Sequence, residues 1–198
     1  GTEELVVNSS RKLFRVGQKC SINGSRSFKD FVMESRFSEA VSIADEQVSE
    51  GADMIDINLD SENVDEIAAM ERFIKIAVTE PNVSKVPFVI SSSQFEVMEA
   101  GLKWCQGKPI VNGLSLRDGE DLFRSRATLF RKHGVAVLVA AVDEKGPALT
   151  AASKVQVVLH CYSILVNEIK YPPEDIIFDP ILMQIETLAR ANSEKSSS

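Results

Sequence analysis

Cysteine and histidine are scarce in this 198-residue chain, and their scarcity argues against a structural metal site. The cysteines Cys20, Cys105 and Cys161 form no Cys-x-x-Cys pair. A zinc site needs several Cys or His ligands at close spacing, so no metal is expected. Both histidines, His133 and His160, fall within predicted helices and are expected to be structural. Scattered, unpaired cysteines indicate a reducing intracellular compartment, the cytoplasm or else an organelle.

Positive charge and membrane-length segments are also lacking. Lysine and arginine number 22 against 29 aspartates and glutamates, which gives a formal net charge of −7. Without a concentrated basic stripe, nucleic acid is not an expected partner. No apolar run approaches the roughly 18 residues of a membrane helix, so no membrane association is expected. The N-terminal GTEELVV also lacks the pattern of a secretory signal.

What the chain does contain is a repeated strand–helix unit. Strands are predicted at Leu13–Val16, Met54–Asn58, Pro87–Ser91, Pro109–Leu114, Val135–Val142 and Asp175–Phe178. Amphipathic helices are predicted over Phe37–Glu50, from about Asn63, after Ser93, between Gly119 and Gly134, over Ala152–Ile169 and over Leu182–Arg190. Because each crossover contains a helix, the strands are expected to pair in parallel.

This alternation predicts an α/β fold of the (β/α)8 TIM-barrel type, incomplete, with about six strand–helix units. A full barrel takes about 250 residues, so the chain is two units short. A six-stranded remnant has two unpaired edges, which native proteins avoid. We therefore expect a protein partner or a missing C-terminal barrel segment to cover them. The alternative is a compact doubly wound sheet.

The domain organisation follows from the same pattern. Residues 1–12 are polar and are expected to form an extended lead-in. Residues 13–190 are expected to form the barrel domain. The serine-rich stretch 191–198 is expected to be a disordered tail.

Polar side chains at the predicted strand ends are the candidates for a functional site, because the loops at the carboxyl ends of barrel strands form the sites of this fold. These side chains are Asp56, Asn58, Asp60, Asn112 and Asp143. The first three either contact a ligand or partner at the barrel mouth, or cap the following helix and order its loop. The alternative for Asp143 is a hydrogen bond to the nearby Lys145 or to loop amides.

These strand ends resemble the pterin-binding (methyltetrahydrofolate) barrel domain of cobalamin-dependent methionine synthase. The resemblance runs from Leu13 to Pro180 and is carried by VGQKCSINGSR, GADMIDINLD, AAMERFIKIAVTEPNVSKVPFVISSS, EAGLKWCQGKPIVNGLSLRDGEDLF, VAAVDEKG and PPEDIIFDP. It implies a barrel truncated after the sixth of eight strands, 5-methyltetrahydrofolate as ligand, and methyl transfer to cobalamin. No Asp-x-His-x-x-Gly cobalamin motif is present, so cobalamin is expected only on a partner domain.

Transferred residue by residue, the resemblance implies that Asp56, Asn58, Asp60, Asn112 and Asp143 bind the cofactor. It further implies that Asn112 and Asp143 are the catalytic groups. In that family, N5 of the pterin must gain a proton or a strong hydrogen bond as the methyl group leaves. The retained aspartates and asparagines are the residue types that can match the donors and acceptors of a pterin edge.

The departures from the family pattern fall in the same site. Gln18 and Ser21 replace an acid and an amide of the first loop, Ser91 stands where the pterin-contacting aspartate belongs, and Ile181 replaces an asparagine. Each lost buried polar contact costs about 1–3 kcal/mol. The resemblance therefore predicts a diverged methyltetrahydrofolate-binding domain whose methyl transfer is weak or lost. The alternative is a non-catalytic pseudoenzyme that serves as a structural or interaction subunit of a larger assembly.

Overall fold

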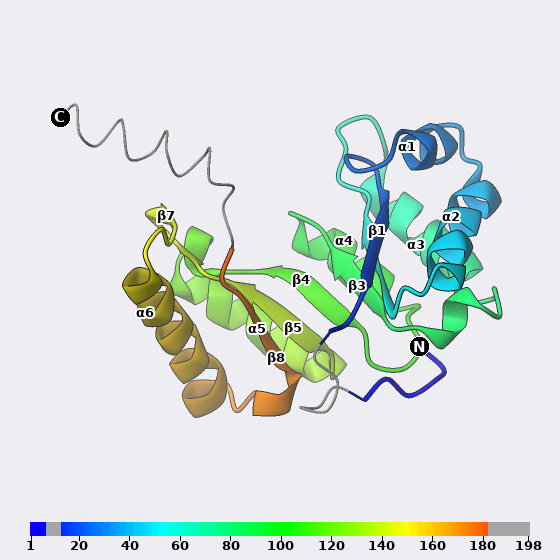
Figure 1. Cartoon of the computed structure of the whole chain (residues 1–198). Helices are drawn as coiled ribbons and strands as arrows, with labels where there is room; N and C mark the ends of the chain where they lie inside the picture. The colour runs from blue at the N-terminus through cyan, green and yellow to red at the C-terminus, as the bar shows by residue number, and fades with distance from the viewer. Residues whose placement is uncertain (7–12, 182–198) are drawn as a thin grey trace.

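The computed structural model describes residues 1–6 and 13–181 and contains a six-stranded sheet whose strands all run parallel (Figure 1). The strands lie in the order of the chain: β1 (Val16–Ser21), β2 (Met54–Asn58), β3 (Phe88–Ser91), β4 (Ile110–Leu114), β5 (Ala136–Ala140) and β8 (Ile176–Asp179). A short antiparallel hairpin follows β5 and consists of β6 (Val142–Asp143) and β7 (Gly146–Pro147).

Helices connect consecutive strands and lie along the outside of the sheet (Figure 1). They are α1 (Arg26–Met33), α2 (Phe37–Ser49), α3 (Glu66–Ala77), α4 (Phe95–Leu102), α5 (Glu120–His133) and α6 (Ala151–Tyr162), which continues as a π-helical segment (Ser163–Glu168). Short 3-10 turns lie at Val83–Lys85, Leu116–Asp118 and Pro173–Asp175. In the described part of the chain, no helix is long and apolar enough to span a membrane.

The predicted α/β architecture with six parallel strands is confirmed, and the barrel is incomplete. Within the described residues, β1 pairs only with β2 and β8 pairs only with β5, so the sheet does not close. The sheet consequently keeps two edges and an inner face.

Apolar side chains pack on both faces of the sheet, because alternate strand residues point to opposite sides. The outer side holds the large core beneath the helices, with Ile55, Ile57, Phe28 and Phe73 fully buried. The inner face has a smaller buried cluster near the amino-terminal ends of its strands, made of Met54, Val89, Ile110 and Ala136. Leu5, Phe14 and Leu138 pack against this cluster. The lead-in around Leu5 therefore contacts the inner face.

The first strand–helix unit differs from its prediction. The strand predicted at Leu13–Val16 lies instead at Val16–Ser21, so Gly17 is a strand residue. Helix α1 was not predicted; it begins after Ser25, whose side chain accepts a hydrogen bond from the Phe28 amide at 3.3 Å. The helix predicted over Leu182–Arg190 and the tail at 191–198 lie outside the described residues.

Candidate functional site

Three polar side chains form a hydrogen-bonded row on the inner face, near the carboxyl ends of β2, β3 and β4. Alternation along β2 sends Ile55 and Ile57 into the core and leaves Asp56 on the opposite face. The Ser91 hydroxyl donates to Asp56 Oδ1 at 2.5 Å, and Asn112 Nδ2 donates to Ser91 Oγ at 3.1 Å. Parallel pairing thus joins side chains that are 35 and 21 positions apart in sequence.

The row presents hydrogen-bond acceptors in a partly water-excluded setting. Burial raises the pKa of the Asp56 carboxyl above its usual value, and the hydrogen bond from Ser91 opposes that shift. Ser91 is only 4% exposed. Among the described residues, nothing donates a hydrogen bond to the Asn112 amide oxygen. A carboxylate and an amide oxygen flanking a buried hydroxyl suit a ligand that offers N–H donors.

Asp60 forms a second cluster that ties three loops together. Its carboxylate accepts a hydrogen bond from the Ser92 hydroxyl at 2.6 Å and from the Ser93 amide at 2.8 Å. Its own amide donates to Asn58 Oδ1 at 2.9 Å, and its carbonyl oxygen accepts from Asn23 Nδ2 at 3.4 Å. Asn58 and Asp60 therefore order the loops that follow β1, β2 and β3.

The cap of helix α3 comes from a different residue. Asp65 Oδ1 accepts a hydrogen bond from the Ala68 amide at 3.1 Å. The alternative to ligand contact was that these residues cap the following helix and order its loop. The hydrogen bonds of Asn58 and Asp60 order the loop, and the helix cap comes from Asp65 instead.

Asp143 lies apart from the inner row. It belongs to the β6–β7 hairpin, and its Oδ1 accepts a hydrogen bond from the Lys145 amide at 2.8 Å. It borders a small pocket of about 180 Å³ together with Leu116, Glu120, Glu144, Lys145 and His160. Within the described residues no hydrogen bond joins Asp143 to Asn112. The bond from the Lys145 amide is the alternative considered for Asp143 in the sequence.

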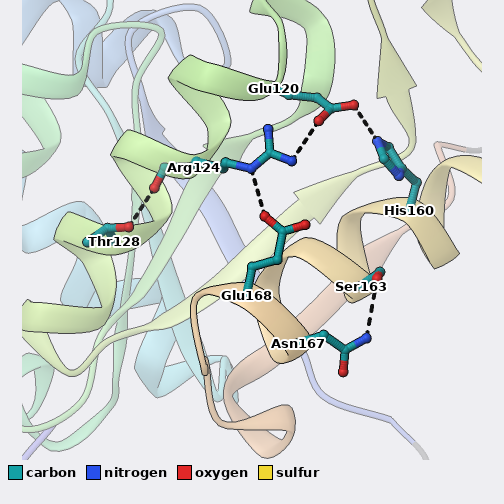
Figure 2. A network of polar contacts seen from close by, with 7 residues as sticks. All are labelled: Glu120, Arg124, Thr128, His160, Ser163, Asn167 and Glu168. Carbon is teal, nitrogen blue, oxygen red and sulfur yellow. Dashed lines mark hydrogen bonds and ion pairs between the residues drawn. The ribbon is translucent and has the colours of Figure 1, made fainter.

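An ion-pair network adjoins this small pocket and links α5 to α6 (Figure 2). Glu120 pairs with His160 Nε2 at 2.7 Å and with Arg124 at 2.7 Å, and Arg124 also pairs with Glu168 at 2.9 Å. These two basic partners lower the pKa of the Glu120 carboxyl. Across residues 1–6 and 13–181, no three His, Cys, Asp or Glu side chains are grouped to hold a metal ion.

A cavity borders the edge strand β1, where two of the substituted positions lie. Gln18 and Ser21 line it, as does Asp56 from the neighbouring strand. Its volume is about 630 Å³. A cavity of this size is within the range of small-molecule sites, and it places the altered first loop next to the retained carboxylate.

Ile181, the other substituted position, has an unusual backbone. Its φ is +46°, in the left-handed region that a β-branched residue rarely adopts. The Ile181 amide donates to Asp179 Oδ1 at 2.8 Å, and Lys154 Nζ donates to its carbonyl oxygen at 2.8 Å. The turn after β8 therefore keeps a conformation that asparagine tolerates better than isoleucine.

Sequence reasoning missed two polar residues that support the site. Ser92, which bonds Asp60, is 6% exposed, and Gln47, which borders the β1 cavity, is 4% exposed. Gln47 follows Ile43 by four positions on the apolar face of α2. A lone amide on an otherwise apolar helix face was the available signal, because buried polar groups need hydrogen-bond partners.

Comparison with known proteins identifies the class of the chain. A family model described as "Pterin binding enzyme" matches residues 18–195, so the chain belongs to the pterin-binding enzyme family. The pterin-binding part of the sequence-based prediction is therefore confirmed.

Solved structures of two relatives share the fold. A Yersinia pestis DHPS structure with a pterine-sulfa conjugate aligns with a TM-score of 0.64 at 15% identity, over 98% of this chain and 69% of that one. A Xanthomonas albilineans dihydropteroate synthase, in complex with indole-2-carboxylic acid and 6-chloroguanine, aligns with a TM-score of 0.62 at 16% identity, over 92% of this chain and 66% of that one. The chain thus spans about two thirds of the length of these structures.

Proposed function

We propose that this chain binds the pterin ring of a reduced folate, 5-methyltetrahydrofolate, on the inner face of the sheet. We further propose that its methyl transfer to cobalamin is weak or lost. The observation that supports binding most strongly is the Asp56–Ser91–Asn112 row, in a chain of the pterin-binding enzyme family. The choice of methyltetrahydrofolate rests on the strand-end motifs that resemble methionine synthase.

The row suits the edge of a pterin ring, which carries N–H donors beside ring acceptors. The Asp56 carboxylate accepts such donors, and the free oxygen of Asn112 accepts another. Because Asp56 is partly desolvated, a charge-assisted hydrogen bond to it is stronger than one in water. A ligand that lacked these donors would leave the site's buried polar groups unpaired.

The expectation of weak chemistry comes from the other strand ends. Methyl departure needs a proton or a strong hydrogen bond at N5. Ser91 supplies a hydroxyl where the family has an acid, Ile181 supplies no polar side-chain atom, and Asp143 is bonded to Lys145. Cobalamin, if used, would come with another domain and supply the methyl acceptor.

Calorimetric titration with 5-methyltetrahydrofolate tests the proposal. Binding tighter than about 100 µM is expected, between the millimolar and micromolar marks of the affinity scale. Asn112→Leu should weaken binding at least tenfold. The substitution removes the amino group that donates to Ser91 and the amide oxygen that would accept from the ligand. The matched control is Asn167→Leu, an exposed amide on the π-helical segment that bonds Ser163 (Figure 2). Equal affinity for both variants would contradict the proposed site.

A second measurement separates binding from chemistry. With cob(I)alamin added, the absorbance of methylcobalamin reports methyl transfer, and we expect little or none from the natural sequence. The double substitution Ser91→Asp with Ile181→Asn should tighten folate binding if the cavity keeps its shape. If the double variant binds folate no more tightly than the natural sequence, the pocket itself has collapsed or been filled.

The second candidate is a non-catalytic structural or interaction subunit. Its support is that Asp56, Ser91 and Asn112 already bond one another in the row without a ligand, while β1 and β8 have no further strand partner within the described residues. Absence of folate binding, together with isolation of the chain in a stable complex, would favour this function over the first.

A further inference from the structure

Strand β1 contains a bulge opposite the candidate site. Gly17 is in register with Ile55 and Cys20 with Ile57, so two residues of β1 stand against the single residue Asp56 of β2. Bulges are rare in parallel pairs and often lie next to functional sites, where they redirect side chains. The bulge of β1 lies beside the Asp56 carboxylate of the inner row.

The bulge decides which side chains face the cavity. With it, Cys20 points to the helix-covered core, where it is fully buried, and Ser21 pairs with Asn58 and lines the cavity. A regular register would slip the strand by one residue beyond Gly17, and a one-residue slip exchanges the two faces. Cys20 would then face the inner side of the sheet, and Lys19 would face the core.

Gln47 of α2 holds the irregular backbone in place. Its Oε1 accepts a hydrogen bond from the Lys19 amide at 2.7 Å. Its Nε2 donates to the Ile43 carbonyl oxygen at 3.1 Å and to Cys20 Sγ at 3.3 Å. The side chain therefore gives the displaced amide of the bulge an acceptor and fixes the thiol beside it.

The close approach of Gln47 also explains the glycine at the start of the bulge. A Cβ on Gly17 would lie 2.7 Å from Gln47 Oε1 and 2.9 Å from Ile55 Cδ1. Both distances are shorter than van der Waals contact, so a side chain at position 17 would displace the amide of Gln47 or the strand. The position of the Gln47 side chain therefore requires a glycine at position 17.

We propose that Gln47 is a positioning residue that fixes the β1 bulge and thereby turns Ser21, rather than Cys20, toward the candidate pterin site. The geometric part of the proposal stands without any ligand. Its consequence for ligand binding rests on the proposed function, and the two parts are tested separately.

Thiol labelling of the full chain tests the geometry. Burial raises the pKa of Cys20 to about 12, and it does the same for Cys161, which is also fully buried. Both thiols should react slowly with N-ethylmaleimide at pH 8, since the thiolate is the nucleophile. Gln47→Leu removes the acceptor for Lys19, and Cys20 labelling, followed by peptide mass spectrometry, should accelerate at least tenfold while Cys161 stays protected.

The matched control is Gln156→Leu, the same change at an exposed position of α6. It should leave both labelling rates unchanged. If Gln47→Leu does not fold, Gly17→Ala keeps the glutamine and crowds it, and the same selective exposure of Cys20 is expected. A Cys20 rate equal to wild type, or equal increases at Cys20 and Cys161, would overturn the proposal.

Titration of the same variants with 5-methyltetrahydrofolate tests the consequence. If the wild-type chain binds, Gln47→Leu should weaken binding at least tenfold and Gln156→Leu should not. Exposure of Cys20 with unchanged folate affinity would overturn the role of Gln47 in the site. Absence of binding by the wild type would contradict the proposed function instead, and the labelling result would then decide the geometric part by itself.

Discussion

At the two ends of the sheet, aspartates at strand ends find their hydrogen-bond partners in opposite ways. On the β2 side, Asp56 and Asp60 accept hydrogen bonds from serines of the neighbouring β3 segment, 32 to 35 residues away. On the β5 and β8 side, Asp143 and Asp179 each accept a hydrogen bond from a backbone amide two residues further along the chain. In one half of the rim the aspartate side chains are bonded across strands, and in the other half they are bonded within their own turns.

An aspartate at a strand end can thus stabilise either the packing of two strands or only its own turn. A cross-strand carboxylate contributes only when the strands are assembled, so it ties the loops of a site together. A carboxylate bonded within its own turn stabilises that turn whether or not a site exists. The half of the rim with cross-strand bonds is therefore the half that keeps an organised site, and it contains the row proposed to bind a pterin.

The largest expected effect comes from breaking the cross-strand half at Asp60. Asp60→Ala removes the acceptor of Ser92 and Ser93 and should lower the free energy of unfolding by about 2–3 kcal/mol, since hydrogen bonds to charged groups are the stronger ones. Urea unfolding measures this. The equivalent change on the local half, Asp143→Ala, should cost less than about 1 kcal/mol. Similar losses for the two variants would refute the contrast.

Ser91→Ala should have the next largest effect. It leaves both Asp56 and Asn112 without their hydrogen-bond partner in the row, and we expect a loss of about 1–2 kcal/mol in unfolding free energy. The exposed Ser93 provides the control, because its backbone amide rather than its hydroxyl bonds Asp60. Ser93→Ala should change stability by less than about 0.5 kcal/mol. A neutral Ser91→Ala would mean that the row contributes nothing to folding.

On the local half, Ile181→Asn should increase stability. A left-handed backbone costs a side chain such as isoleucine about 1–2 kcal/mol, and asparagine tolerates it better. We expect a gain of about 1 kcal/mol in thermal or urea unfolding. Ile177→Asn, on the extended strand β8, is the control and should bring no gain. If Ile181→Asn destabilises the chain, the strain at this turn has been compensated by packing.

The smallest effect should come from Asp56→Asn, and it should depend on pH. Because the pKa of Asp56 is raised in the folded chain, the folded state holds the proton more tightly than the unfolded state. The wild type is therefore relatively most stable below the unfolded pKa, about 3.9, and loses that contribution as pH rises through the folded pKa.

Asparagine at position 56 still accepts from Ser91 and carries no charge. Asp56→Asn should gain about 0.5–1 kcal/mol at pH 7 over the wild type, within the range of favourable single substitutions. The gain should shrink toward pH 3.5 in parallel denaturation experiments. The exposed Asp30→Asn should show no such gain at neutral pH. If the stability gain of Asp56→Asn grew on acidification, the pKa of Asp56 would be lowered rather than raised in the folded chain.

The sequence was sufficient to predict the six parallel units and to select Asp56 and Asn112 as polar residues at strand ends. Regular alternation and helical crossovers determine both, because carboxyl ends of parallel strands share one edge. The bulge at Gly17 was not predictable in this way: its glycine resembles a turn signal until the buried Gln47 is known to lie against it. For Asp143, the hydrogen bond from the Lys145 amide is the alternative that the sequence offered, because an aspartate in a turn can accept from a backbone amide two residues further along the chain.

The hydroxyl of Ser91 also gives the inner row a direction. An ionised Asp56 can only accept, so Ser91 must donate to it and must accept from the Asn112 amino group. The amide is thereby held with its oxygen turned away from Ser91, and the row as a whole offers acceptors. A single proton on Asp56 removes this constraint, since a carboxylic acid can donate and every hydrogen bond in the row can then run the other way. Protonation of the Asp56 carboxyl on β2 would therefore change what Asn112, two strands away on β4, presents to a ligand.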